Sequence, residues 1–349
     1  MCGFVPILQD VPNGDMVVAR GNKSFVHRPT MRSIGMPLSI RTAVKGLLTF
    51  VPGIKRVLPE RGTGGTNSAH YCYGVWLKHL TLLWENGMRS MPNTLAELGP
   101  GDSLGVGLAA LLCGVKRYYA LDVVRHSNIE VNLKIFDELV ELLKSRTGRP
   151  TKGWPDIDKF LDSNLFPSHI LNDGLLKESL SEERIKAIHN AIQNPAHHTR
   201  EVTIKYMVPW SDEKIIENNT VDIILSHSVL EHVVDLENTY QALYSWLRPT
   251  GMMSHQIDFQ SHGVSEKWNG YRMYSELLWK IMLGKRSFLI NRQPHSMHID
   301  IMKKNDFIIA CDLTRHRKDG IQRSDLSKYW ENITNDDLTC SGAYILAIK

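Results

Sequence analysis

The segment Glu97–Ser103 reads ELGPGDS, and it decides the fold. It follows a short apolar run, Thr94–Leu98, and precedes the helical pattern Leu104–Cys113, which Gly114 ends. Glycines in such a loop let the backbone approach a ligand and adopt torsions that a side chain would forbid. Ligands of doubly wound sheets bind beyond the carboxyl ends of the strands, so this strand–loop–helix unit predicts a binding loop.

Strands and helices alternate after this loop. Further strands are expected at Arg117–Leu121, Val202–Val208, Val221–Ser226, Gly251–Ile257, Phe307–Cys311 and Ala343–Ile348. Helices are expected at Asn128–Ser145 and Leu236–Leu247. The alternation predicts an α/β fold, a doubly wound and mostly parallel seven-stranded sheet with helices on both faces.

The chain divides into three parts on this interpretation. Residues 1–61 form a basic N-terminal arm, residues 62–93 carry a cap helix, and residues 94–349 form the main domain. The cap helix is expected at Ala69–Glu85, where aromatic and apolar residues recur on one face.

Two long insertions interrupt the main domain, at residues 146–200 and 258–298. A structureless loop of that length is improbable in a compact domain, so both are expected to form helical caps over the site. The first contains the helix-forming run Glu178–Ile192. The second carries four large aromatic residues, which would pack as the core of the cap or form a stacking wall for a sugar. These are Trp268, Tyr271, Tyr274 and Trp279.

The composition is that of an ordinary globular protein, with 42% hydrophobic and 22% charged residues. No stretch approaches the roughly 18 consecutive apolar residues of a membrane-spanning helix. The five cysteines lie far apart without C-x-x-C spacing, and the first residues lack the pattern of a secretory signal. We therefore expect a cytoplasmic protein with reduced thiols.

The net charge of +4 is unevenly distributed. Eight of the 41 basic residues lie between Met16 and Pro59, a segment without Asp or Glu, so the rest carries 33 basic and 37 acidic residues. Such local basicity argues against nucleic acid as a partner. Within it, Leu38–Val51 has a helical apolar stripe beside Arg41 and Lys45. Such a stripe is usually a core face. The alternative is weak membrane-surface contact through residues 38–56, which would suit an anionic or lipid-linked acceptor.

Acidic residues flank the glycine loop. Glu97 and Asp102 lie at the loop itself, and Asp122 ends the second strand, where a carboxylate can accept both hydroxyls of a ribose. A nicotinamide site would need a third glycine at Leu104, whereas the next glycine is Gly105. Carboxylates at the loop would also repel a pyrophosphate. They suit a ligand with a positive sulfonium and an amine instead.

The glycine loop resembles the first motif of class I S-adenosylmethionine-dependent methyltransferases, and Asp122 matches their ribose-binding acid. The segment SHSVLEHV at Ser226–Val233 is similar to the one after their fourth strand, and LRPTGM at Leu247–Met252 resembles the turn into their fifth. The resemblance covers about Thr94 to Phe259 and implies the Rossmann-like methyltransferase fold with S-adenosylmethionine as cofactor.

Two further stretches, Tyr71–Leu80 and His255–Phe259, resemble a bacterial subgroup associated with surface glycans and secondary products. That resemblance implies a small-molecule or glycan acceptor, methylated at oxygen or nitrogen. It does not identify the acceptor.

The resemblance also implies a set of cofactor-binding residues along the strand ends. They are Glu97, Gly99, Pro100, Gly101, Asp102, Asp122, Val123, Val208, Ser226 and His227. Many family members carry an acid after the third strand, where the nearest one here is Asp212.

Methyl transfer to a hydroxyl is helped by a general base. Candidates are His227 and His232 after the fourth strand and His255, Asp258 and His262 after the fifth, each of which could equally be structural. We prefer Asp258 paired with His255 or His262, because the end of the fifth strand should face the acceptor. No catalytic metal is expected, although His295 and His298 could join these residues near one place.

Two other classes of protein remain open at this point. One is a methyltransferase-like scaffold without activity, against which the intact acids and glycines argue. The other is a nicotinamide-dependent dehydrogenase, which the missing third glycine opposes.

Overall fold

The computed structural model describes residues 38–51, 64–151, 160–194, 201–210, 213–286 and 289–349. Most of the basic arm lies outside these ranges, and so does Asp212. No helix in the described ranges is long and apolar enough to cross a membrane.

Seven strands form one sheet in the order β3-β2-β1-β4-β5-β7-β6. Neighbours from β3 to β5 are parallel, and β7 runs antiparallel to both β5 and β6. The strands are β1 (Thr94–Leu98), β2 (Arg117–Leu121), β3 (Thr203–Met207), β4 (Val221–His227), β5 (Leu247–Asp258), β6 (Ile308–His316) and β7 (Cys340–Ile348). The expected doubly wound, mostly parallel sheet is therefore confirmed.

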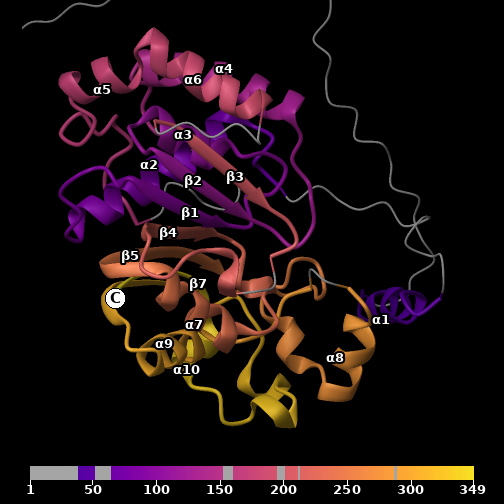
Figure 1. Cartoon of the computed structure of the whole chain (residues 1–349). Helices are drawn as coiled ribbons and strands as arrows, with labels where there is room; N and C mark the ends of the chain where they lie inside the picture. The colour runs from indigo at the N-terminus through magenta and orange to yellow at the C-terminus, as the bar shows by residue number, and fades with distance from the viewer. Residues whose placement is uncertain (1–37, 52–63, 152–159, 195–200, 211–212, 287–288) are drawn as a thin grey trace, which may run out of the picture. The chain divides into compact units, whose positions relative to one another are not determined.

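Helices cover both faces of the sheet, as Figure 1 shows. One face carries α2 (Ala69–Glu85), α3 (Gly105–Leu112), α4 (Ile129–Lys144), α5 (Asp173–Ser179) and α6 (Glu182–Gln193). The other carries α7 (Leu236–Trp246), α9 (His295–Lys304) and α10 (Asn335–Thr339). Each face encloses its own hydrophobic cluster, so α2 belongs to the core of the fold rather than to a separate cap.

The turn expected before the fifth strand lies inside that strand. β5 begins at Leu247, which pairs with Val221, and the register then shifts so that Met252 pairs with Ile223. Thr250 has a positive φ of 67° in the irregular stretch between them. The strand thus continues through the turn as a bulge, which local turn residues do not reveal.

The first insertion contains two helices where one was expected. The break comes at Ser181, whose side chain accepts a hydrogen bond from the amide of Arg184 and so begins α6. α6 packs on α3, α4 and β3, so it joins the helical layer instead of covering the strand ends.

The first described helix, α1 (Leu38–Leu48), packs on α8 (Glu276–Leu283). Its apolar stripe was expected to face a core, but Val44 and Leu47 are 41% and 55% exposed. The buried residues are Thr42 and Gly46. A Cβ on Gly46 would lie 2.0 Å from the carbonyl oxygen of Ile281, so the close approach of the two helices requires glycine. The interpretation of the stripe as a core face is therefore wrong.

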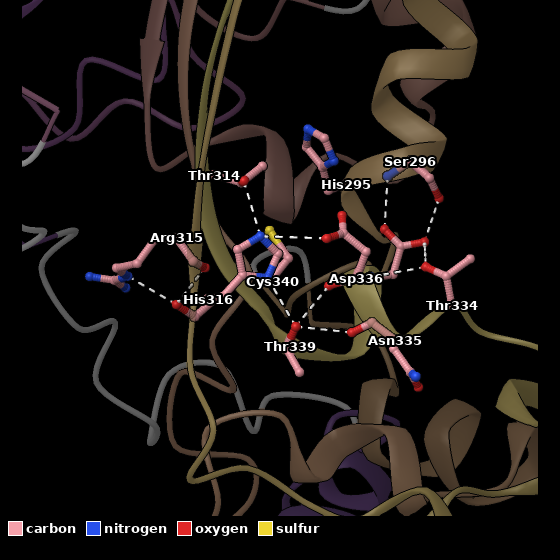
Figure 2. Close-up of polar contacts among 12 residues, drawn as sticks. His295, Ser296, Thr314, Arg315, His316, Thr334, Asn335, Asp336, Thr339 and Cys340 are labelled. Atoms are coloured by element: carbon pink, nitrogen blue, oxygen red, sulfur yellow. Dashed lines mark hydrogen bonds and ion pairs between the residues drawn. The ribbon is translucent and has the colours of Figure 1, made fainter.

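Polar contacts tie the β6–β7 pair to α9 and α10 (Figure 2). Asp337 accepts hydrogen bonds from the amide of Ser296 at 3.0 Å and from its hydroxyl at 2.7 Å, which caps the start of α9. Beside them, His316 contacts the hydroxyl of Thr339 at 2.9 Å and lies 3.6 Å from Asp336. These contacts fix the edge of the sheet beside α9.

Candidate functional site

The register of the central strands aligns their carboxyl ends. Glu97 of β1 pairs with Ala120 of β2 on one side and with Leu225 of β4 on the other. The amide of Gly99 donates to the carbonyl of Leu121 at 2.8 Å, immediately before Asp122. The acids at the ends of β1 and β2 are therefore neighbours at the carboxyl ends of the parallel strands, as the sequence predicted.

Glu97 is buried, with 3% of its surface exposed, and accepts a hydrogen bond from the hydroxyl of Tyr118. Burial, with a smaller contribution from the nearby charge of Asp122, raises the pKa of Glu97 to about 8. A cationic partner beside this buried carboxyl group would favour its ionised form.

The glycine loop takes the conformation that its residues permit. Gly99 and Gly101 have positive φ values of 63° and 76°. A Cβ on Gly99 would lie 2.6 Å from a methyl carbon of Val229, in the segment after β4. The amide of Asp102 donates to the hydroxyl of Thr66 at 2.8 Å. The loop is thus held from two sides, with the buried Pro100 at its centre.

Asp122 turns its carboxylate back onto the following backbone. Its Oδ1 atom accepts from the amide of Val123 at 2.7 Å, and burial raises the pKa of its carboxyl group. Val123 itself is 48% exposed, while Val208 at the end of β3 is half-buried. Asp122 donates its amide to Met207 of β3, which brings this third strand end into the same region.

Two of the predicted site residues face the other side of the sheet. Ser226 and His255 are fully buried and contact each other, with 2.8 Å between Oγ and Nδ1. The ring of His255 meets that of Tyr240 in α7, and burial lowers the pKa of His255 to about 3. Both residues have the environment of the core, which argues against His255 as the general base.

A buried polar network lies between α2 and the sheet. His227 contacts His79 at 3.1 Å, His79 contacts Ser254 at 2.7 Å, and Ser254 contacts Tyr344 at 2.6 Å. Burial lowers the pKa of both His79 and His227 well below the usual range, and the nearby charge of Lys78 acts in the same direction. No polar role was predicted for α2, because its periodicity is that of a core helix.

Another fully buried polar residue of α2 lies beside this network. Lys78 donates to the side-chain oxygen of Gln256 at 2.7 Å. Gln256 in turn donates to the carbonyl of Ala343 in β7 at 3.1 Å. The ammonium group is therefore held against the end of β5 at the core side of the sheet.

Carboxylates and histidines gather at the ends of β4 and β5. The Nε2 atom of His262 lies 3.5 Å from Asp258 and 4.0 Å from Glu231. The rings of His232 and His262 meet edge to face, with centroids 5.0 Å apart. The structure thus brings three predicted catalytic residues, His232, Asp258 and His262, together and adds Glu231.

Sequence reasoning missed Glu231 and Tyr71. Burial raises the pKa of Glu231 well above its usual range, and the charge of Asp258 adds to this rise. The ring of Tyr71 in α2 contacts the ring of His227. Burial is the main cause that raises the pKa of the Tyr71 hydroxyl, and the charges of Glu231 and Glu97 add to it. The ring of Tyr71 therefore lies beside the end of β4. The position of Glu231 directly before His232 was the available signal.

The large aromatic residues of the second insertion are mostly buried. Tyr271 and Trp279 belong to a hydrophobic cluster with Met282, and Trp268 is 7% exposed. They form the core of this region and not an open stacking wall.

The seven-stranded, mostly parallel sheet with helices on both faces has the Rossmann-like methyltransferase fold. A family model described as a methyltransferase domain matches residues 179–254, which include β3 and β4 and exclude the glycine loop. These findings support an S-adenosylmethionine-dependent methyltransferase. No curated protein matches the sequence.

Solved methyltransferase structures resemble the chain at low identity. One is a Galdieria sulphuraria protein with a proposed sarcosine dimethylglycine methyltransferase activity, at 12% identity and a TM-score of 0.40 over 78% of this chain and 83% of that one. Another is Haemonchus contortus phosphoethanolamine N-methyltransferase 2, at 12% identity and 0.39 over 78% and 52%. A third, from Mesorhizobium loti, has 10% identity and 0.37 over 78% and 98%. With TM-scores of 0.40 or less, these similarities do not indicate the acceptor of this chain.

The acid of the glycine loop generates a prediction about stability. A glutamate whose folded pKa lies above its unfolded value stabilises the fold at low pH and loses that contribution as the pH rises, here from about 4.5 to about 8. Glu97→Gln removes the titration. We expect the unfolding free energy of the wild type to fall relative to the variant across this range, by at most about 1.4 kcal/mol per pH unit. Thermal unfolding of both proteins from pH 5 to 9 measures it. A difference that does not change with pH would contradict the assignment.

The neighbouring acid generates a prediction about binding. Asp122→Ala should weaken S-adenosylmethionine binding by about 1–3 kcal/mol, since ribose hydroxyls would lose a charged acceptor. Calorimetry measures the affinity, with Asp319→Ala as a control because that acid pairs with Arg317 at the surface. Equal affinities of the wild type and Asp122→Ala would show that the ribose binds elsewhere.

Proposed function

We propose that the chain transfers the methyl group of S-adenosylmethionine to an oxygen or nitrogen atom of a small-molecule or glycan acceptor. The observation that carries this proposal is the placement of two acidic groups at the ends of adjoining strands. Glu97 lies one residue before the end of β1 and Asp122 follows β2, while Asp258 ends β5 and His262 follows it. Val229, packed against Gly99, connects the two groups through the segment after β4.

The first group of residues fits the proposed cofactor. S-adenosylmethionine supplies a methyl group on a positive sulfonium, so a nucleophile displaces it in line. Glu97 is a buried carboxyl group beside a loop with two positive-φ glycines, and it suits the cationic amino-acid end. Asp122 suits the ribose hydroxyls. The protein's contribution is to align the two reactants and exclude water.

The second group suits the acceptor. A hydroxyl acceptor loses its proton as its oxygen bonds to the methyl carbon, whereas a protonated amine must lose a proton before its nitrogen can attack. The pair formed by Asp258 and His262, 3.5 Å apart, is proposed to take that proton. Nearby Glu231 and His232 complete the polar surroundings.

Substitution of Asp258 or His262 should lower the rate of methyl transfer without changing the affinity for the cofactor. We expect Asp258→Asn and His262→Asn each to lower kcat by about 10²–10⁴-fold, because a general base contributes that much. The affinity for S-adenosylmethionine should stay within about twofold in calorimetry. Asp319→Asn is the matched surface control.

The acceptor needed for that assay comes from a screen. Incubation of the protein with isotopically labelled S-adenosylmethionine and fractions of a metabolite and glycan extract, followed by mass spectrometry, identifies what gains a methyl group. Cofactor binding without transfer to any fraction would favour the scaffold alternative. No heat on cofactor addition would overturn the proposal itself.

We also propose that α1 makes weak contact with a membrane surface and that the acceptor is anionic or lipid-linked. The support is a group of exposed apolar side chains beside Arg41 and Lys45, on α1 and in the residues directly after it. They are Ile40, Val44, Leu47, Leu48, Phe50 and Val51. Of the segment expected to make this contact, residues 52–56 lie outside the described part of the chain.

Sedimentation with liposomes tests this contact. We expect more protein to sediment with vesicles that contain phosphatidylserine than with neutral ones, since both apolar insertion and basic residues contribute. Leu47→Glu should reduce sedimentation with anionic vesicles severalfold, while Leu277→Glu, an exposed position on α8, serves as the control. Equal sedimentation with both kinds of vesicle would count against the proposal.

A further inference from the structure

Three potential ligand side chains lie together after β4 and β5. Glu231, His232 and His262 each offer one ligand atom, and the three atoms lie within 4.8 Å of one another. Asp258 contributes a second carboxylate, 3.5 Å from the Nε2 atom of His262. We propose that this cluster binds one divalent first-row transition-metal ion, with Glu231, His232 and His262 as its ligands.

The types of ligand favour this class of ion. Imidazole nitrogens together with a carboxylate suit Zn²⁺, Co²⁺, Fe²⁺ and related ions, whereas Mg²⁺ and Ca²⁺ prefer oxygen ligands alone. Two carboxylates, Glu231 and Asp258, also balance the double positive charge of such an ion. The three ligands leave coordination positions open for other groups.

The state of Glu231 is an independent observation that points to a cation. Its side chain is 3% exposed, and neither of its carboxylate oxygens accepts a hydrogen bond from the described residues. A buried carboxylate without such partners is costly, and a bound cation removes that cost.

The backbone around the cluster is held in place, as a ligand site requires. Asn291 donates its amide to the carbonyl of Glu231 at 2.6 Å, and its side chain donates to the carbonyls of Leu230 and Val233 at 2.7 Å each. His262 has a positive φ of 47°, a conformation that turns this residue at the end of the β5 loop. The second insertion thus fixes the segment that carries two of the three ligands.

Only the catalytic role of the metal ion, and not its binding, depends on the proposed function. If the acceptor binds at the ends of β4 and β5, an ion there would bind the acceptor's oxygen and make its proton more acidic. Asp258 would then take the proton, because the Nε2 atom of His262 would face the ion. Metal binding itself requires neither the cofactor nor the acceptor.

Co²⁺ binding by the full-length, untagged protein tests the inference. After treatment with a chelator and dialysis, titration with Co²⁺ should give one ion per chain, with visible absorption bands typical of nitrogen and oxygen ligands. Glu231→Gln, which keeps the size of the side chain, and His262→Asn should each weaken Co²⁺ binding at least about tenfold. Thermal unfolding shows whether each variant is folded, and His232→Asn replaces any that is not.

His316→Asn is the matched control, because His316 also lies beside a carboxylate, that of Asp336 at 3.6 Å, but outside the cluster (Figure 2). It should bind Co²⁺ as the wild type does. No binding by the wild type, or equal binding by wild type and cluster variants, would overturn the site. An equal loss in His316→Asn would also overturn it. Calorimetry with S-adenosylmethionine is run on the same samples, so a failure of the proposed function is seen separately.

Discussion

Parallel pairing of β1 with both β2 and β4 is the constraint on which the site depends. A parallel register fixes which residues end each strand at the same edge, and here it sets Glu97 beside Ala120 and Leu225. A shift by one residue would turn Glu97 to the opposite face and separate it from Tyr118. Backbone pairing alone therefore brings three segments together at the carboxyl ends of the strands. They are the glycine loop, the end of β2 and the segment after β4.

Buried polar groups concentrate near this edge. Glu97, Glu231, Lys78 and His79 are all essentially inaccessible to water. Each lowers stability unless a partner compensates, and such groups cluster where a protein binds or transforms a ligand. Lys78 and His79 have partners in β5, whereas the two glutamates keep raised pKa values. These raised pKa values fit the proposed roles of the two glutamates in binding charged ligands.

The sequence predicted the elements with strong local signals. β1, β2 and α2 have the expected bounds, since an apolar run followed by glycine or an acid marks a strand end and Ser68 caps α2. It failed where tertiary packing decides. The bulge in β5, the outward face of α1 and the burial of His255 depend on partners far along the chain. The cluster at Glu231 and His262 likewise joins two loops that only the sheet brings together.

The contact of α1 with α8 depends on a close backbone approach at Gly46. Gly46 brings the backbones so close that any side chain at this position would meet the carbonyl of Ile281. The large residues Val44 and Leu47 point to solvent. Tolerance of substitution along this helix is therefore the reverse of that in an ordinary amphipathic helix, in which the bulky residues are restricted and the small ones vary freely.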